Sequence, residues 1–154
     1  MKKNLLAASL VAFMGTSVAA TEIGATFSKF DDNWLTVLRN GMVEYAGTID
    51  GLSYQQVDAT DDIAKQIDQV KNFVASGVDA IIVCCSNPTA LNASVEYAYK
   101  NDVAVFSGIG YLTSPYSINS SANFVVGGRM MGEWMANEIG GKGRVLNVEG
   151  IPGT

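Results

Sequence analysis

The chain has 154 residues, a formal net charge of −5 and no histidine. Because 48% of its residues are hydrophobic and only 16% are charged, the composition is that of a folded protein rather than a disordered one. The lack of histidine excludes catalytic triads and dyads built on that residue, and it excludes histidine-ligated metals. The acidic charge balance also disfavours binding to a nucleic-acid backbone, which requires clustered lysine and arginine.

The first twenty residues have the layout of a secretory signal peptide. Two lysines precede the apolar stretch 5–14, which is too short to span a bilayer, and small residues follow at 17–20. We expect cleavage after Ala19 or Ala20, with an uncleaved membrane anchor as the alternative. Removal of residues 1–20 would leave 134 residues, and the loss of two lysines would change the net charge from −5 to −7. The predicted product is a periplasmic bacterial protein that does not insert into the membrane.

Strands and helices alternate along the rest of the chain. Strands are predicted at residues 22–28, 52–57, 78–85 and 103–106. Between them, apolar residues recur at helical spacing in three groups: Trp34, Leu38, Met42 and Tyr45; Ile63, Ile67, Val70 and Val74; and Leu91, Val95 and Ala98. Asn87 and Pro88 are expected to begin the third helix. This order predicts an α/β fold with a parallel sheet flanked by helices on both faces, in which ligands bind at the carboxyl ends of the strands.

The last third of the chain has a different composition. Residues 108–123 lack charge and are rich in glycine, serine and asparagine, which indicates a loop with a short strand at 116–120. A helix is predicted from about 126 to 139, and a strand from 144 to 149. Because the chain stops soon after a strand with no following helix, we expect it to be incomplete at the C-terminus, with a natural short domain as the alternative.

No motif completes a known catalytic or phosphate-binding pattern. The glycines at 108–110 and 140–143 lack the other residues of a phosphate-binding loop and are interpreted as turns. The aspartate pairs at 31–32 and 61–62 lie where helices start, so they are interpreted as N-caps rather than as catalytic pairs. No cluster of metal ligands occurs, and neither a cofactor nor a metal is expected.

Cys84 and Cys85 are the only cysteines, and they are adjacent. A periplasmic location favours disulfides. Neighbouring residues of a strand point to opposite faces, however, so a bridge between them would be strained. We therefore interpret both cysteines as small buried hydrophobic residues.

Residues 28–34, with the sequence SKFDDNW, combine aromatic rings, carboxylates and an amide at the end of the first predicted strand. Sugars need this mixture, because their hydroxyl groups donate to carboxylates and their C–H faces pack on aromatic rings. In the alternative interpretation, Asp32 or Asn33 caps the following helix and Trp34 packs in the core. The residues alone leave both interpretations open.

The strand IGATFS followed by KFDDNW resembles the start of periplasmic sugar-binding proteins of the galactose/glucose and ribose type, in which the galactose type has K-Y-D-D-N-F. Further similar stretches are QxxQxxxxVASGVDAIIV with Gln66 and Gln69, the Asn87-Pro88 turn, NDVAVF and the final VVGGRMMGEWMANEIGGKGRVLNVEGIPGT. Their order and spacing cover essentially all 134 residues that follow the signal.

This resemblance implies two Rossmann-like α/β lobes of the type I periplasmic binding protein fold, which close on a sugar held between them. Residues 21–121 would form most of lobe one. Residues 122–154 would form the hinge crossing and a truncated start of lobe two. Proteins of this family are about twice as long, so the resemblance also implies a fragment.

The resemblance assigns candidate ligand-binding residues by position. Asp32 corresponds to a polar ligand of the sugar and Trp34 to the aromatic stacking residue. Ser28 lies where the ribose type has serine, while Phe30 and Asn33 are neighbours with weaker claims.

Further along the chain, this sequence departs from the family pattern. After the fourth strand the family places asparagine or aspartate, but this chain has Ile109, for which Ser107 or Tyr111 would have to substitute. Asn123 falls at the hinge crossing, where an acidic residue is common. The identity of the sugar therefore stays open.

The resemblance implies a solute-binding component of an ABC-type importer that delivers a monosaccharide to permease subunits, without catalysis. The alternative is a sensory module that presents a sugar or autoinducer-like ligand to a chemoreceptor or kinase. A secreted glycoside hydrolase is disfavoured because Asp31 and Asp32 are adjacent and cannot face each other across a cleft. A DNA-binding regulator of the same fold is disfavoured by the signal peptide and the lack of a helix-turn-helix segment.

Overall fold

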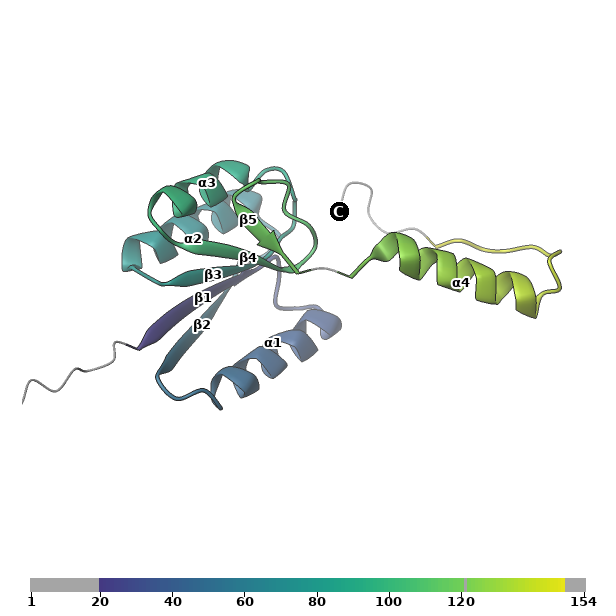
Figure 1. Ribbon diagram of the computed structural model, residues 1–154, viewed down its shortest axis with the longest axis horizontal. Coiled ribbons are helices and arrows are strands. Elements are labelled where there is room, and N and C mark those ends of the chain that lie inside the picture. Colours follow the sequence, from purple (N-terminus) through teal and green to yellow (C-terminus); the bar gives the residue numbers. More distant parts are fainter. Residues whose placement is uncertain (1–19, 121, 149–154) are drawn as a thin grey trace, which may run out of the picture.

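The computed structural model describes residues 20–120 and 122–148, and their sheet contains five parallel strands (Figure 1). The order across the sheet is β2-β1-β3-β4-β5. The strands are β1 (Thr21–Phe27), β2 (Leu52–Asp58), β3 (Ala80–Cys84), β4 (Ala104–Ile109) and β5 (Ser117–Asn119). Because all strands run the same way, their carboxyl ends lie at one edge of the sheet. The predicted parallel sheet is thus confirmed. The signal-peptide prediction falls on residues 1–19, outside the described residues, and on residue 20.

Helices cover both faces of this sheet, as the alternating pattern predicted. Helix α1 (Asn33–Ala46) lies on one face, and α2 (Ile63–Ser76) and α3 (Asn92–Lys100) lie on the other (Figure 1). Helix α4 (Phe124–Glu138) lies apart from the sheet, and none of its side chains is buried. In the described part of the chain, no helix is both long enough and apolar enough to cross a membrane.

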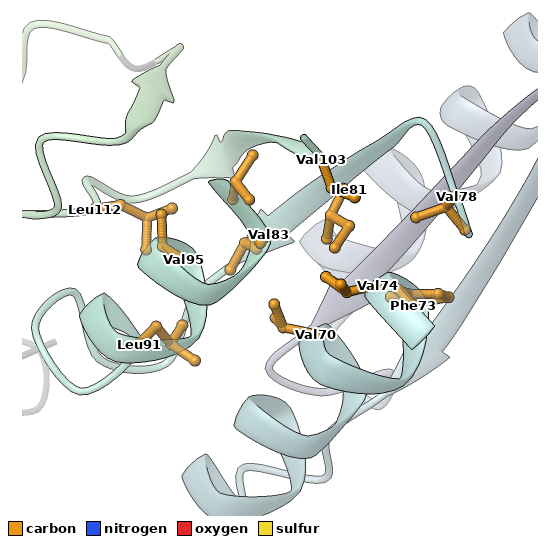
Figure 2. Close-up of a cluster of buried hydrophobic side chains, with 12 residues drawn as sticks. Val70, Phe73, Val74, Val78, Ile81, Val83, Leu91, Val95, Val103 and Leu112 are labelled. Atoms are coloured by element: carbon orange, nitrogen blue, oxygen red, sulfur yellow. The ribbon is translucent and has the colours of Figure 1, made fainter. Parts of the chain in front are cut away.

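Strand β3 is buried on both faces, which explains its nearly unbroken apolar sequence. Ile81 and Val83 belong to the larger core under α2 and α3, which Figure 2 shows. Ile82 and Cys84 belong to a smaller cluster under α1. The larger core consists of Val70, Phe73, Val74, Val78, Ile81, Val83, Leu91, Val95, Ala98, Val103, Val105 and Leu112.

The two cysteines lie on opposite sides of the sheet, as the alternation of a strand requires. Cys84 packs in the cluster under α1, whereas Cys85 packs against the core under α2 and α3. Both are free. Burial raises the pKa of the Cys84 thiol to about 12, and it raises the pKa of the Cys85 thiol as well. Neither environment favours a reactive thiolate.

The predicted apolar stripe of α1 is only partly correct. Leu38 and Met42 pack against the sheet, and Leu35 is buried. Trp34 and Tyr45, however, are 61% and 69% exposed. They lie in the first and last turns of the helix, so spacing alone does not place them over the sheet.

Three predicted boundaries in the second half of the chain were wrong. The third helix begins at Asn92 rather than at Asn87-Pro88, because Asn87 Oδ1 accepts from the backbone N–H groups of Thr89 and Ala90 and closes a separate turn. Strand β4 continues past residue 106 to Ile109 through a register irregularity against β3. Helix α4 begins two residues earlier than predicted, after an N-cap at Asn123.

The strand predicted at residues 144–149 is absent from the described part, 144–148. A strand needs a neighbour to complete its hydrogen-bond ladder. The ladders of the five-stranded sheet do not include these residues.

The short strand predicted at 116–120 is present as β5, and a side chain holds it beside β4. Only seven residues, 110–116, connect these two parallel strands, although such connections usually need a dozen or more. The loop folds back on itself, because Asn119 Oδ1 accepts from Leu112 N at 2.8 Å and Asn119 Nδ2 donates to Leu112 O at 3.0 Å. Leu112 is buried in the core under α3. The Asn119 amide thus replaces a backbone pairing.

Gly24 allows α2 to approach β1 closely, and this contact generates a stability prediction. A Cβ at position 24 would lie 2.5–2.7 Å from ring atoms of Phe73, which is buried and cannot move freely. We expect Gly24→Ala to lower the free energy of unfolding by about 1–3 kcal/mol, as overpacking does. Urea denaturation would measure the change.

Gly41→Ala is the matched control. Gly41 lies within α1, and apart from the neighbouring backbone of its own helix nothing lies within 4 Å of an added Cβ. Helix propensity should therefore raise the free energy of unfolding by about 0.5–1 kcal/mol. A loss at position 41, or no loss at position 24, would contradict the packing assigned to these helices.

Candidate functional site

The order of the strands identifies where a ligand can bind. The chain passes from β1 outward to β2 and then crosses back to β3 on the other side of β1. In parallel α/β sheets, ligands bind outside the carboxyl ends of strands at such a switch point. The loops that meet there are residues 28–32 after β1 and 85–91 after β3. They are flanked by residues 59–62 after β2 and 110–116 after β4.

Asp32 caps α1 at this edge. Its Oδ1 accepts from Leu35 N at 2.8 Å, which satisfies one of the free N–H groups of the first turn. Its other carboxylate oxygen keeps its capacity to accept a hydrogen bond. Asp31 and Asn33 are exposed on either side of it. Capping by Asp32 was one of the two interpretations of this segment, and it leaves one oxygen for a ligand.

Trp34 is the exposed aromatic residue of this loop. Its side chain is 61% exposed in the first turn of α1, so the alternative that places it in the core is wrong. Phe30 is half-buried instead. Its ring meets the Phe27 ring edge to face, with 6.1 Å between the centroids. Of the two aromatic candidates, Trp34 is therefore the one that offers a flat apolar surface to a ligand.

Arg39 holds both the ring and the backbone carbonyl of Phe30. The sequence analysis did not identify this residue. The guanidinium carbon lies 3.8 Å from the ring centroid, and Arg39 Nη2 donates to Phe30 O at 3.2 Å. Such a cation over an aromatic face is attractive. Arg39 Nε is buried and has no hydrogen-bond partner among the described residues. The only signal in the sequence was a basic residue within the helix, which by itself indicates a solvated position.

Ser28 joins the ends of three strands through its backbone. Its N–H donates to Cys84 O at 3.0 Å, and its carbonyl accepts from Asp61 N at 2.6 Å. Thr60 and Asp61 both have left-handed backbone angles, with φ of 54° and 55°, which is unusual for residues other than glycine. Lys29 pairs with Asp61 at 3.4 Å. Strained backbone of this kind persists where surrounding contacts hold it in place.

Two other predicted residues have structural contacts of their own. Ser107 is only 1% exposed, because β4 extends beyond it, and its Oγ accepts from Ser120 N at 3.1 Å. The structure does not bring Ser107 to the open edge, which Gly110 and Tyr111 form instead. Asn123 caps α4, since its Oδ1 accepts from Val126 N at 3.0 Å.

A hollow of about 280 Å³ lies between the carboxyl ends of β3 and β4, and sequence reasoning did not identify its polar group. Ser86 and Pro88 line it from one side, and Gly110 and Tyr111 from the other. Ser86 Oγ is buried and has no hydrogen-bond partner among the described residues. Because a buried hydroxyl without a partner is costly, this atom is a candidate ligand contact. A serine after a strand gave no distinguishing signal in the sequence.

The groups at this edge can bind a ligand that carries hydroxyl groups. Hydroxyl, carboxylate and aromatic groups lie at the strand ends, and histidine is absent from the chain. Within the described residues, no group of three or more cysteine, aspartate or glutamate side chains could hold a metal ion.

A family model described as a periplasmic binding protein domain matches residues 23–154. The chain belongs to the periplasmic binding protein family. Membership implies a periplasmic location, and the related proteins named below are binding proteins. The resemblance to this family and the type I fold predicted from the sequence are both confirmed.

Individual relatives agree with this assignment. A Rhizobium meliloti protein described as a candidate rhizopine-binding protein is 35% identical over 97% of this chain and 50% of its own length. A periplasmic solute-binding protein of an ABC transporter from Actinobacillus succinogenes, solved with bound D-allose, has a TM-score of 0.76 and 25% identity over 86% of this chain and 49% of its own. The fructose-binding periplasmic domain of a hybrid two-component system has a TM-score of 0.71 and 26% identity over 80% of this chain and 41% of its own. The chain spans about half the length of the relatives it matches.

The cap at Asp32 can be tested separately from any binding role. Asp32→Ala should lower the free energy of unfolding by about 1 kcal/mol, because Leu35 N loses its acceptor. Asp32→Asn keeps an acceptor oxygen and should change it by less than about 0.5 kcal/mol. Chemical denaturation of both variants would measure these values.

Asp62 offers the matched control, because it caps α2 through Lys65 N at 3.1 Å. The same two substitutions at Asp62 should follow the same pattern. Equal losses for alanine and asparagine at position 32 would contradict a cap that acts through its hydrogen bond.

Proposed function

We propose that the chain contributes lobe one, residues 21–121, and the hinge crossing and start of lobe two, residues 122–154, to a two-lobed solute-binding protein. Its ligand is a small neutral molecule with several hydroxyl groups, most simply a monosaccharide. The protein reaches the periplasm through a signal peptide at residues 1–20 and delivers its ligand to the permease subunits of an ABC importer.

The observation that carries this proposal is the set of groups at the carboxyl edge of the sheet. Asp32 and Ser86 offer oxygen atoms for ligand hydroxyl groups, and Trp34 offers an exposed ring. Carboxylates and hydroxyls pair with sugar hydroxyls, while a ring packs on apolar sugar faces. Ser28, Phe30 and Asn33 shape the same loop, and Tyr111 flanks Ser86. Ser107 is buried and supports the end of β4 by accepting from Ser120 N, whereas Asn123 is exposed and caps α4.

The family supports the same class of ligand. A solved relative holds D-allose, and another is a fructose-binding domain. This chain has Ile109 where the family usually has a polar ligand, so the identity of the sugar cannot be carried over from the relatives. We therefore propose the class of ligand and leave the individual sugar to measurement.

A sensory role is the second candidate, and one observation favours it. The fructose-binding neighbour belongs to a hybrid two-component system, so the same fold serves signalling. Deletion of the gene separates the two roles. Loss of sugar uptake would support import, whereas normal uptake with loss of sugar-induced transcription would support sensing by a chemoreceptor or kinase.

Trp34→Ala tests the proposed site. Loss of the stacked ring should weaken sugar binding by about fivefold or more, which corresponds to about 1 kcal/mol. Isothermal titration calorimetry would measure affinity for D-ribose, D-galactose, D-allose, D-fructose and myo-inositol, using protein expressed from its full reading frame.

Tyr45→Ala is the control on the same helix. Tyr45 is equally exposed but lies in the last turn of α1, at the other end from the proposed site. It should leave affinity within twofold of the wild type. No binding of any of these compounds, or equal effects of the two variants, would contradict the proposal.

A further inference from the structure

We propose that Gln66 is a positioning residue that holds Ser86 at the carboxyl edge of the sheet, and that the Ser86 hydroxyl bonds to the ligand. This inference rests on the proposed function, because it assigns a ligand contact within the proposed site. Gln66 entered the sequence analysis only as part of a family-like stretch, with no role attached.

Gln66 is a polar residue inside the core. It is 0% exposed in α2, where an unpaired amide would be costly. Both ends of the amide have partners across the helix–sheet interface. Gln66 Nε2 donates to Cys84 O at 3.1 Å, and Gln66 Oε1 accepts from Ser86 N at 3.2 Å. The side chain therefore spans the turn at the end of β3 and fixes both sides of it.

Ser86 is where this positioning acts. The backbone of Ser86 is held by Gln66, and the residue lines the hollow after β3 and β4. Its Oγ is buried and has no partner among the described residues. A fixed backbone limits the orientations of the short serine side chain. A preorganised hydroxyl binds a ligand better than a mobile one, because less conformational entropy is lost. A ligand hydroxyl in the hollow would satisfy this oxygen once a rotation of the short Ser86 side chain turns it toward the hollow.

Gln69 shows that the arrangement at Gln66 is specific. It lies one turn further along α2 and also uses both ends of its amide, donating to Asp58 O at 2.8 Å and accepting from Thr26 Oγ1 at 2.6 Å. These partners lie on β1 and β2. Gln69 thus supplies a side chain of the same type and similar bonding that does not reach Ser86.

A double-mutant cycle on protein from the full reading frame tests the inference. Ser86→Ala should weaken binding of the tightest-binding sugar among D-ribose, D-galactose, D-allose, D-fructose and myo-inositol by about 3- to 10-fold. Gln66→Leu should cause a loss of the same order. The double variant should bind no more than about twofold worse than Ser86→Ala, because Gln66 acts through Ser86.

Gln69→Leu should destabilise the fold to a similar degree while leaving affinity within twofold. An unchanged affinity in Gln66→Leu, or losses that simply multiply in the double variant, would overturn the positioning role. Equal effects of Gln66→Leu and Gln69→Leu on affinity would also overturn it, since general destabilisation would then explain both.

Amide hydrogen exchange distinguishes failure of this inference from failure of the proposed function. Gln66→Leu should accelerate exchange of the Ser86 N–H at least about tenfold, and Gln69→Leu should not. If none of the five compounds binds, the proposed function fails. Hydrogen exchange then still tests whether Gln66 holds the Ser86 N–H. Unaltered exchange in Gln66→Leu would overturn that contact whether or not a sugar binds.

Discussion

The carbonyl oxygen of Cys84 accepts two hydrogen bonds that come from different elements. Ser28 N donates at 3.0 Å from the end of β1, and Gln66 Nε2 donates at 3.1 Å from α2. A carbonyl has two lone pairs, and both are used here. Because β3 lies inside the sheet between β1 and β4, this oxygen fixes the loops after β1 and β3 relative to each other and to the helix layer. The relative positions of Asp32 and Ser86 depend on it.

At the carboxyl edge of the sheet, Asp32 and Trp34 both belong to the start of α1 and both keep atoms that a ligand can contact. Asp32 caps α1 with one oxygen. Trp34 begins the same helix yet stays exposed. This division suits the binding of a ligand. Binding requires groups that are already in place, and contacts such as the cap fix them before the ligand arrives.

Much of the fold could be predicted because its signals are local. The apolar runs and helical spacings located four strands and three helices, since each reflects burial on a face of one element. The prediction failed where the structure of a segment depends on which groups it forms hydrogen bonds with. Residues 144–148 have the composition of a strand but do not join the sheet. The start of α3 was missed because the Asn87 amide caps a separate turn rather than the helix.

The candidate site was harder to predict for the same reason. Asp32 and Trp34 lie two positions apart in the sequence, in a stretch that resembles the family pattern. Ser86 and Arg39 matter only through contacts with distant residues, and a single serine or arginine carries no such information. Ser107 was placed at a strand end, but the register irregularity lets β4 continue and bury it.

The amide of Asn119 has a consequence for how the chain leaves the sheet. It pairs with both backbone groups of Leu112, and Leu112 is anchored in the core. Strand β5 is only three residues long, so few backbone hydrogen bonds attach it to β4. Two side chains therefore hold the chain where it leaves the sheet: the Asn119 amide and the Ser107 hydroxyl, which accepts from Ser120 N. In the two-lobed protein proposed above, this amide would hold the point at which the chain leaves lobe one for the hinge crossing.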